Sequence, residues 1–144
     1  MILLDTSALL TFLLGESGES EVASLLRSGE CAIPAPCLAE SIDRLIRKQG
    51  TSSDAIPEHL GPLVEESVSV LVIDTQVAWR AGEIRAAHYH RKAAALSLAD
   101  CLVLASAAPE DRIATSDAAL AATADTLDLT VIPLPDSTGH HPNI

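Results

Sequence analysis

Short apolar runs alternate with longer stretches of helical periodicity along most of the chain. The apolar runs predict buried β-strands at residues 2–4, 31–33, 68–73, 113–115 and 130–132. The stretches between them predict helices at residues 7–14, 17–28, 37–49, 53–66, 75–90, 97–108 and 117–124. Strands that alternate with helices in this way indicate an α/β fold with a central, mostly parallel sheet.

Two of the predicted helices carry features that bear on their shape. In the helix at residues 53–66, Pro62 follows Gly61 and removes a backbone donor, so an interruption is expected there. In the long helix that begins at residue 75, Trp79 and Ile84 are both expected to face the core.

The apolar pattern ends near residue 133. Residues 1–133 contain no repeat, linker or low-complexity block, and their length suits one core, so they predict a single domain. The prolines, Gly139 and polar residues that follow predict a flexible tail over residues 134–144. Hydrophobic residues make up 48% of the chain, which is ample for a core without disulfides.

Nothing in the sequence predicts a membrane span or an exported protein. No run of eighteen apolar residues occurs, and the first ten residues lack the basic leader of a signal peptide. The three cysteines leave one over after pairing and match no zinc spacing, which is typical of reduced, buried thiols. A cytoplasmic location is expected.

The formal net charge of −11 argues against nucleic acid as a partner, but its distribution changes that picture. Residues 44–92 hold seven of the nine basic side chains against six acidic ones. The rest of the chain holds two basic and fourteen acidic residues. Some of those acids must be solvated surface, and others are candidates to bind cations.

Four acids stand where a parallel sheet would gather them. Asp5 follows the first strand and Asp117 follows a later one, and the carboxyl ends of parallel strands form the usual ligand crevice. Asp100 lies in a helix that is apolar on nearly every side, where an unpaired carboxylate is costly. Glu40 lies on the polar side of the third helix.

Each acid also has a local structural explanation. Asp5 and Asp117 could cap or begin helices, and Asp100 could complete the capping box of its own helix. Glu40 could form an ordinary ion pair with Arg44, four residues further on. All four local explanations would have to suffice at once for the chain to lack a site, and this favours a shared function.

The segments around these acids resemble the motifs of PIN-domain nucleases. ILLDTSAL at residues 2–9 is similar to the opening motif of that family, and AE at residues 39–40 resembles the second acidic position. LADCLVLA at residues 98–105 and ATSDAAL at residues 114–120 resemble the third and fourth. The motifs occur in order across residues 1–133, and the length is most similar to VapC-type toxins of bacterial toxin–antitoxin pairs.

The resemblance implies a three-layer α/β/α sandwich, a Mg²⁺ or Mn²⁺ ion and cleavage of RNA. It implies that Asp5, Glu40, Asp100 and Asp117 are catalytic, with all three aspartates as metal ligands and Ser7 supporting Asp5. It also implies a cognate antitoxin, a small protein whose C-terminal segment wraps the toxin and blocks its site.

The chemistry of phosphodiester hydrolysis agrees with that set of residues. The anionic ester repels hydroxide, and a hard cation held by carboxylates neutralises charge and activates water. Glu40 could bind a second ion or orient the water, and these roles stay open. Arg44, Arg47 and Lys48 could bind substrate phosphates or simply form a solvated helix face.

Other classes of protein also place acids at the ends of parallel strands. A response-regulator receiver domain, with Asp74 as phosphoacceptor, would need a second acid beside Asp5 and a lysine after a late strand, and the chain has neither. A haloacid-dehalogenase phosphatase would need Asp-x-Asp at residues 5–7, where this chain has Asp-Thr-Ser. The stronger alternative is a catalytically inactive PIN-like module that binds protein or RNA. Whether the chain forms a homodimer, and which RNA it cuts, stay open.

Overall fold

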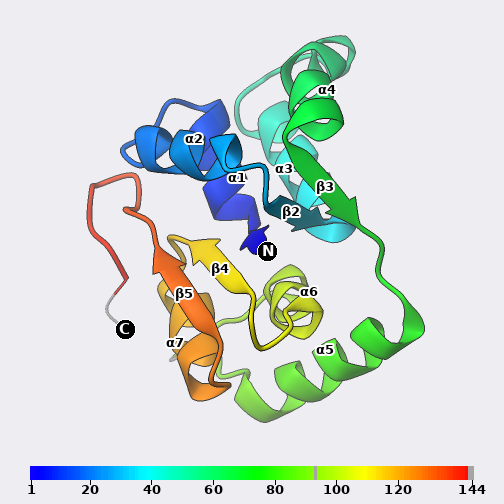
Figure 1. Cartoon of the computed structure of the whole chain (residues 1–144), viewed down its shortest axis with the longest axis vertical. Coiled ribbons are helices and arrows are strands. Elements are labelled where there is room, and N and C mark those ends of the chain that lie inside the picture. The colour runs from blue at the N-terminus through cyan, green and yellow to red at the C-terminus, as the bar shows by residue number, and fades with distance from the viewer. Residues whose placement is uncertain (93, 143–144) are drawn as a thin grey trace.

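A five-stranded parallel sheet forms the centre of the computed structural model, which describes residues 1–92 and 94–142 (Figure 1). The strands, in chain order, are β1 (Ile2–Leu4), β2 (Cys31–Pro34), β3 (Val68–Leu71), β4 (Arg112–Thr115) and β5 (Thr130–Pro133). Their order in the sheet is β3-β2-β1-β4-β5, and every neighbouring pair is parallel. The predicted parallel sheet is therefore confirmed.

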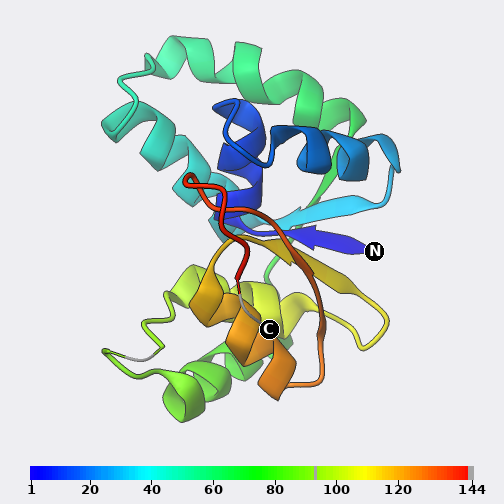
Figure 2. The ribbon, with the colours of Figure 1, turned by 90° about the vertical axis from the view of Figure 1, so that its left-hand side faces the viewer.

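Helices cover both faces of this sheet, which gives the three layers that were expected (Figure 2). One face carries α1 (Thr6–Leu13), α2 (Glu19–Arg27), α3 (Ala35–Arg47), the 3₁₀ turn η1 (Ser53–Ala55) and α4 (Ile56–Glu66). The other carries α5 (Thr75–His88), α6 (Leu98–Ser106) and α7 (Ala118–Thr126). Within the described part of the chain, no helix is both long and apolar enough to cross a membrane.

The order of the strands places a topological switch point beside β1. The chain builds the sheet outward from β1 through β2 to β3, and then returns to the other side of β1 for β4 and β5. Connections therefore leave β1 and β4 in opposite directions, and such points form crevices at the carboxyl ends of the strands. Leu4 pairs with Ala114, so the next residues, Asp5 and Thr115, lie side by side at that edge.

The core explains why β1 and α6 are so apolar. Leu3 and Leu4 of β1 are completely buried, and so are Val103 and Leu104 of α6. Because α6 packs across the sheet with most of its surface covered, its sequence shows no polar face.

The interruption that was predicted at Gly61-Pro62 is wrong. α4 runs without a break from Ile56 to Glu66. A residue before proline normally avoids the helical conformation because its Cβ crowds the proline ring, and Gly61 has no Cβ. Leu60 and Leu63 on either side of this pair are buried, and their packing holds the helix together across the missing donor.

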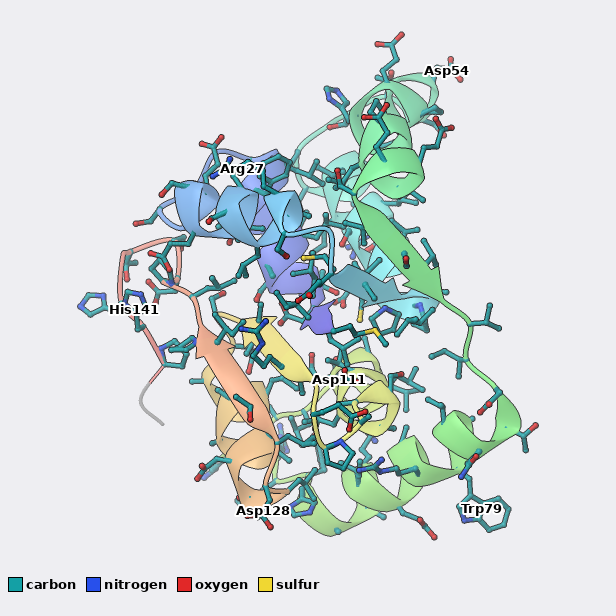
Figure 3. The ribbon with its side chains drawn as sticks, viewed as in Figure 1. Arg27, Asp54, Trp79, Asp111, Asp128 and His141 are labelled. Atoms are coloured by element: carbon teal, nitrogen blue, oxygen red, sulfur yellow. The ribbon has the colours of Figure 1, made fainter. Side chains whose placement is uncertain are left out.

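The prediction that Trp79 faces the core is also wrong, whereas Ile84 is buried as expected. Trp79 is 71% exposed and points away from the body of the molecule (Figure 3). Its indole Nε1 donates to Glu83 Oε1 at 3.0 Å. Residues five positions apart are separated by about 140° around a helix, so these two side chains cannot share one face.

The segment after β5 folds back over the side of the sheet that carries α1 and α2 (Figure 2). Leu134 is fully buried and its backbone N–H donates to Thr115 O at 2.9 Å. Further along, His141 Nε2 lies 4.0 Å from Glu21 Oε2 of α2. Of the tail predicted over residues 134–144, positions 143 and 144 lie outside the described residues.

Candidate active site

Asp5 is the most buried of the four acids and begins the site at the end of β1. Its side chain is the N-cap of α1, because Oδ1 accepts the backbone N–H of Ala8 at 2.8 Å. The Ser7 hydroxyl donates to both carboxylate oxygens at 2.8 and 2.9 Å, and its expected supporting role stays a prediction. From β4, the Thr115 hydroxyl donates to Asp5 Oδ2 at 2.7 Å.

Burial dominates the electrostatics of Asp5. It raises the pKa of this carboxyl from 3.8 to about 6, although the hydrogen bonds from Thr115, Ala8 and Ser7 act in the opposite direction. The negative charge of Asp100 adds to the rise. No Lys, Arg or His among the described residues forms an ion pair with Asp5. Among the described residues, Asp5 therefore has no cationic partner that offsets its burial.

Asp100 reaches the same edge of the sheet from the first turn of α6. It completes a capping box with Ser97, in which Ser97 N donates to Asp100 Oδ2 at 2.6 Å and Asp100 N donates to Ser97 Oγ at 3.0 Å. Burial raises the pKa of the Asp100 carboxyl, and the hydrogen bonds with Ser97 oppose that rise. The charges of Asp117 and Glu40 raise it further.

Asp117 is exposed and caps α7. Its Oδ1 accepts the N–H groups of Ala119 at 2.8 Å and Leu120 at 2.9 Å. Its own backbone N–H donates to Thr115 Oγ1 at 2.9 Å, so a single threonine hydroxyl links Asp117 to Asp5.

Glu40 projects from α3 and is held from two sides. The Thr6 hydroxyl donates to Glu40 Oε2 at 2.7 Å, and Arg44 Nη2 donates to Oε1 at 3.0 Å. The ion pair with Arg44 that the sequence suggested is therefore present. Thr6 directly follows Asp5, so the residue that donates to Glu40 is the next residue after Asp5 at the start of α1.

The four acids thus have their local roles and are neighbours as well. Three lie at the starts of α1, α6 and α7, and the charge interactions that shift the pKa values connect all four. The buried Cys37 thiol beside them has a pKa raised to about 12, by burial first and then by the charges of nearby acids that include Asp5 and Asp100. Across residues 1–92 and 94–142, no group of three or more His, Cys, Asp or Glu side chains is arranged so that it could hold a metal ion in this conformation.

A cavity of about 270 Å³ lies beside Ser7, which hydrogen-bonds to Asp5, and its lining residues include none of the four acids. Ser7 and Ser116 lie at the end of it nearest to Asp5, where Ser116 N donates to Ser7 Oγ at 3.0 Å. Arg44 of α3, Lys48 at the C-cap of that helix, and Asp136 and Ser137 of the segment after β5 also line the cavity.

Arg47 is placed differently from the two basic residues that were grouped with it. It is exposed and donates two hydrogen bonds to Asp43, from Nε to Oδ1 at 2.7 Å and from Nη2 to Oδ2 at 2.6 Å. It is not among the residues that line the cavity. Its predicted contact with substrate stays a prediction.

Two threonines in the site were missed at the sequence level. Thr6 contacts Glu40, and Thr115 contacts both Asp5 and Asp117. The contacts with Glu40 and Asp5 join residues that lie far apart in the sequence. The only signal for Thr115 was its position directly before the Ser116-Asp117 motif, and the strand register that places it beside Asp5 cannot be read from local sequence.

Comparison with known proteins identifies relatives of this arrangement. The sequence model of the family described as PIN domain matches residues 2–126. No curated protein sequence matches the chain.

Solved structures with a similar fold include FitAcB from Neisseria gonorrhoeae, with a TM-score of 0.61 and 24% identity over 92% of this chain and 96% of that one. VapBC2 from Rickettsia felis bound to a DNA fragment from their promoter has a TM-score of 0.66 at 15% identity, over 92% and 98%. FitAB bound to an IR36 DNA fragment has a TM-score of 0.63 at 22% identity, over 92% and 94%. At these identities the likeness shows a shared fold.

Proposed function

The chain belongs to the PIN domain family, a family of nucleases, and from that premise we propose that it is a metal-dependent endoribonuclease. It hydrolyses RNA phosphodiester bonds with water activated by Mg²⁺ or Mn²⁺, and it is the toxin of a toxin–antitoxin pair. Asp5, Glu40, Asp100 and Asp117 are its catalytic acids, and Asp5, Asp100 and Asp117 are its metal ligands.

One observation carries this proposal. Four carboxylates from different elements lie near the switch point of the sheet: the charges of Asp117 and Glu40 raise the pKa of Asp100, and the charge of Asp100 contributes to the raised pKa of Asp5. In the described chain, only Glu40 among them has a cationic partner. Burial of unpaired carboxylates is costly, and the fold accepts that cost where a bound cation would remove it.

The donor set fits a hard cation. All four side chains offer oxygen, which Mg²⁺ and Mn²⁺ prefer, and Mg²⁺ commonly takes only one or two carboxylates and keeps several waters. An open group of acids suits that mode better than a closed cage does. When bound, the ion would supply neutralisation of the phosphate charge and a lower pKa for its water.

The residues around the acids prepare them for this task. Ser7 and Thr115 fix the Asp5 carboxylate so that its orientation is set before substrate arrives. Thr6 and Arg44 do the same for Glu40, which would then bind a second ion or orient the attacking water. These hydrogen bonds reduce the reorganisation that the reaction requires.

Basic side chains next to the acids would hold the RNA backbone. Arg44 of α3 and Lys48, the C-cap residue about one helical turn later, line the cavity beside Ser7. Their positive charge offsets the local acidity, so a phosphate next to the cleaved bond can approach. Arg47 would contribute at longer range, because Asp43 already neutralises it.

The proposed partner is a cognate antitoxin whose C-terminal segment covers the acids. The similar folds of FitAcB and VapBC2 support this assignment, since VapC-type toxins are the class that the sequence resembles. We place the protein in the cytoplasm, where RNA and antitoxin would be available. A homodimer is part of the proposal, and sedimentation of the purified chain measures it directly.

The direct experiment is cleavage of single-stranded RNA by the purified chain. We expect cleavage with millimolar Mg²⁺ or Mn²⁺, and none when a chelator is in excess. Restoring the metal should restore the activity, which shows that chelation did not unfold the protein. Cleavage that persists unchanged in chelator would contradict a metal-dependent enzyme. RNA binding without any cleavage would favour the inactive binding module.

A further inference from the structure

A second hollow, of about 410 Å³, lies between the end of α5 and the start of α6. Its walls include Tyr89, the C-cap residue of α5, and Leu98, the first residue of α6. Tyr89 is 44% exposed and Leu98 is 58% exposed, so both present apolar surface to solvent. None of the roles assigned above uses this hollow.

A cation lies directly against its aromatic wall. The guanidinium carbon of Arg85 is 4.6 Å from the centroid of the Tyr89 ring, which is a cation–π contact. Within the described residues, Arg85 forms no ion pair with a carboxylate, and its buried Nε has no hydrogen-bond acceptor. Arg85 therefore keeps a positive charge that the protein leaves unneutralised.

The hollow lies at the start of the helix that carries Asp100. Leu98 precedes Asp100 by two residues on α6, about 3 Å along the helix axis and about 200° around it, so the two side chains leave the helix on opposite sides. In Figure 2, α3 and α5 lie on opposite sides of the sheet layer, so Arg44 of α3 and Arg85 of α5 belong to different layers.

We propose that this hollow binds one base of single-stranded RNA, with the base stacked on Tyr89 beside Leu98 and its phosphate attracted by Arg85. The proposal rests on the proposed function, because it takes RNA as the substrate of the acids. Aromatic rings next to basic groups are how proteins hold single strands without strong sequence preference. A planar, anionic nucleotide matches a small hollow with one ring, one leucine and one free cation, whereas a protein helix would need a longer apolar groove.

A fluorescent reporter tests the stacking directly, because the chain has a single tryptophan. In the double variant Trp79→Phe and Tyr89→Trp, the new indole lies in the hollow. A further Asp5→Asn change prevents cleavage while Mg²⁺ is present. We expect single-stranded RNA of about eight nucleotides to quench this fluorescence. The chain with Asp5→Asn alone, whose Trp79 lies on the outer part of the same helix, should not respond.

Affinity gives an independent measure. In the Asp5→Asn background, Tyr89→Leu should weaken the binding of this RNA about tenfold or more, and Tyr89→Phe should restore most of it, because only the ring is needed. Trp79→Leu is the matched control, since it removes an aromatic ring that is even more exposed, and it should leave the affinity unchanged. An abasic strand of equal length and charge should bind the Tyr89→Leu variant and its parent equally.

The outcomes separate this inference from the proposed function. Absence of quenching, or equal affinity of the Tyr89→Leu variant and its parent for RNA with bases, would overturn the base site even if the wild-type chain cleaves RNA. Quenching by RNA that the wild-type chain fails to cleave would support the base site and contradict the nuclease.

Discussion

Asp5 is the residue at which the demands of folding and of chemistry conflict most. Its side chain is 3% exposed, accepts hydrogen bonds from Ser7, Ala8 and Thr115, and still has a pKa raised to about 6. Folding alone would favour a neutral group here, whose burial carries no charge penalty. The position of Asp5 was predictable from its place after the first strand. Its partner Thr115 was not, because it lies 110 residues away and only the β1–β4 register brings it near.

This conflict predicts how stability depends on pH in the metal-free protein. Because the folded pKa of Asp5 exceeds its ordinary value of 3.8, its contribution is fully present below about pH 4 and is lost as the pH rises through about 6. The shift corresponds to a loss on the order of 3 kcal/mol in the free energy of unfolding. Asp5→Asn cannot ionise and should lack that loss. Denaturant titrations of both proteins at pH 4 and pH 7 measure it, and equal pH dependence in the two would contradict the raised pKa.

At the scale of elements, the site arises because helix starts and strand ends coincide. α1 begins directly after β1 and α7 soon after β4, and α6 starts at the same edge, so acids that cap these helices are also close to one another. This is why local cap signals in the sequence pointed to acids that the fold brings near one another. Sequence reasoning failed where packing decides: Trp79 lies on the outer side of α5, and α4 continues through Pro62.

The capping box of α6 makes an element-level prediction. Ser97→Ala removes the hydroxyl that accepts from Asp100 N and should destabilise the protein by about 1 kcal/mol, a fall of about 3 °C in Tm. Ser106→Ala is the matched control, because its hydroxyl donates to Leu102 O at the other end of the same helix and caps nothing. Thermal melts compare the two. A larger fall for Ser106→Ala would show that the box does not stabilise the start of α6.

At the scale of the whole molecule, charge is distributed unevenly. The net charge is −11, yet seven of the nine basic residues lie between residues 44 and 92, and these include Arg44 and Lys48 of one cavity and Arg85 of the other. The uneven distribution was visible in the sequence. That these basic residues line two separate cavities depends on how distant segments pack, which local sequence does not reveal.

The same acidity predicts how the proposed antitoxin associates. A basic antitoxin segment should bind quickly at low salt, and the association rate should fall about tenfold or more as salt rises. Asp117→Asn should slow association, because it removes a charge at the site. Asp128→Asn is the control at a distant turn, where the positive φ of 57° suits asparagine equally well. Stopped-flow measurements with the purified antitoxin check this, and equal effects of the two substitutions would contradict binding over the acids.

The measurement that bears most directly on the central claim is the rate of RNA cleavage by variants of the acids. Asp100→Asn and Asp117→Asn keep the size and most hydrogen bonds of each side chain but remove its charge, and each should reduce the rate about 100-fold or more. Asp74→Asn is the matched control, because Asp74 caps α5 through Val77 N at 2.8 Å in the same manner and has no place in the site. We expect Asp74→Asn to cleave at the wild-type rate, with all three variants folded. Full activity of folded Asp100→Asn and Asp117→Asn proteins would show that these acids are not the catalytic metal site.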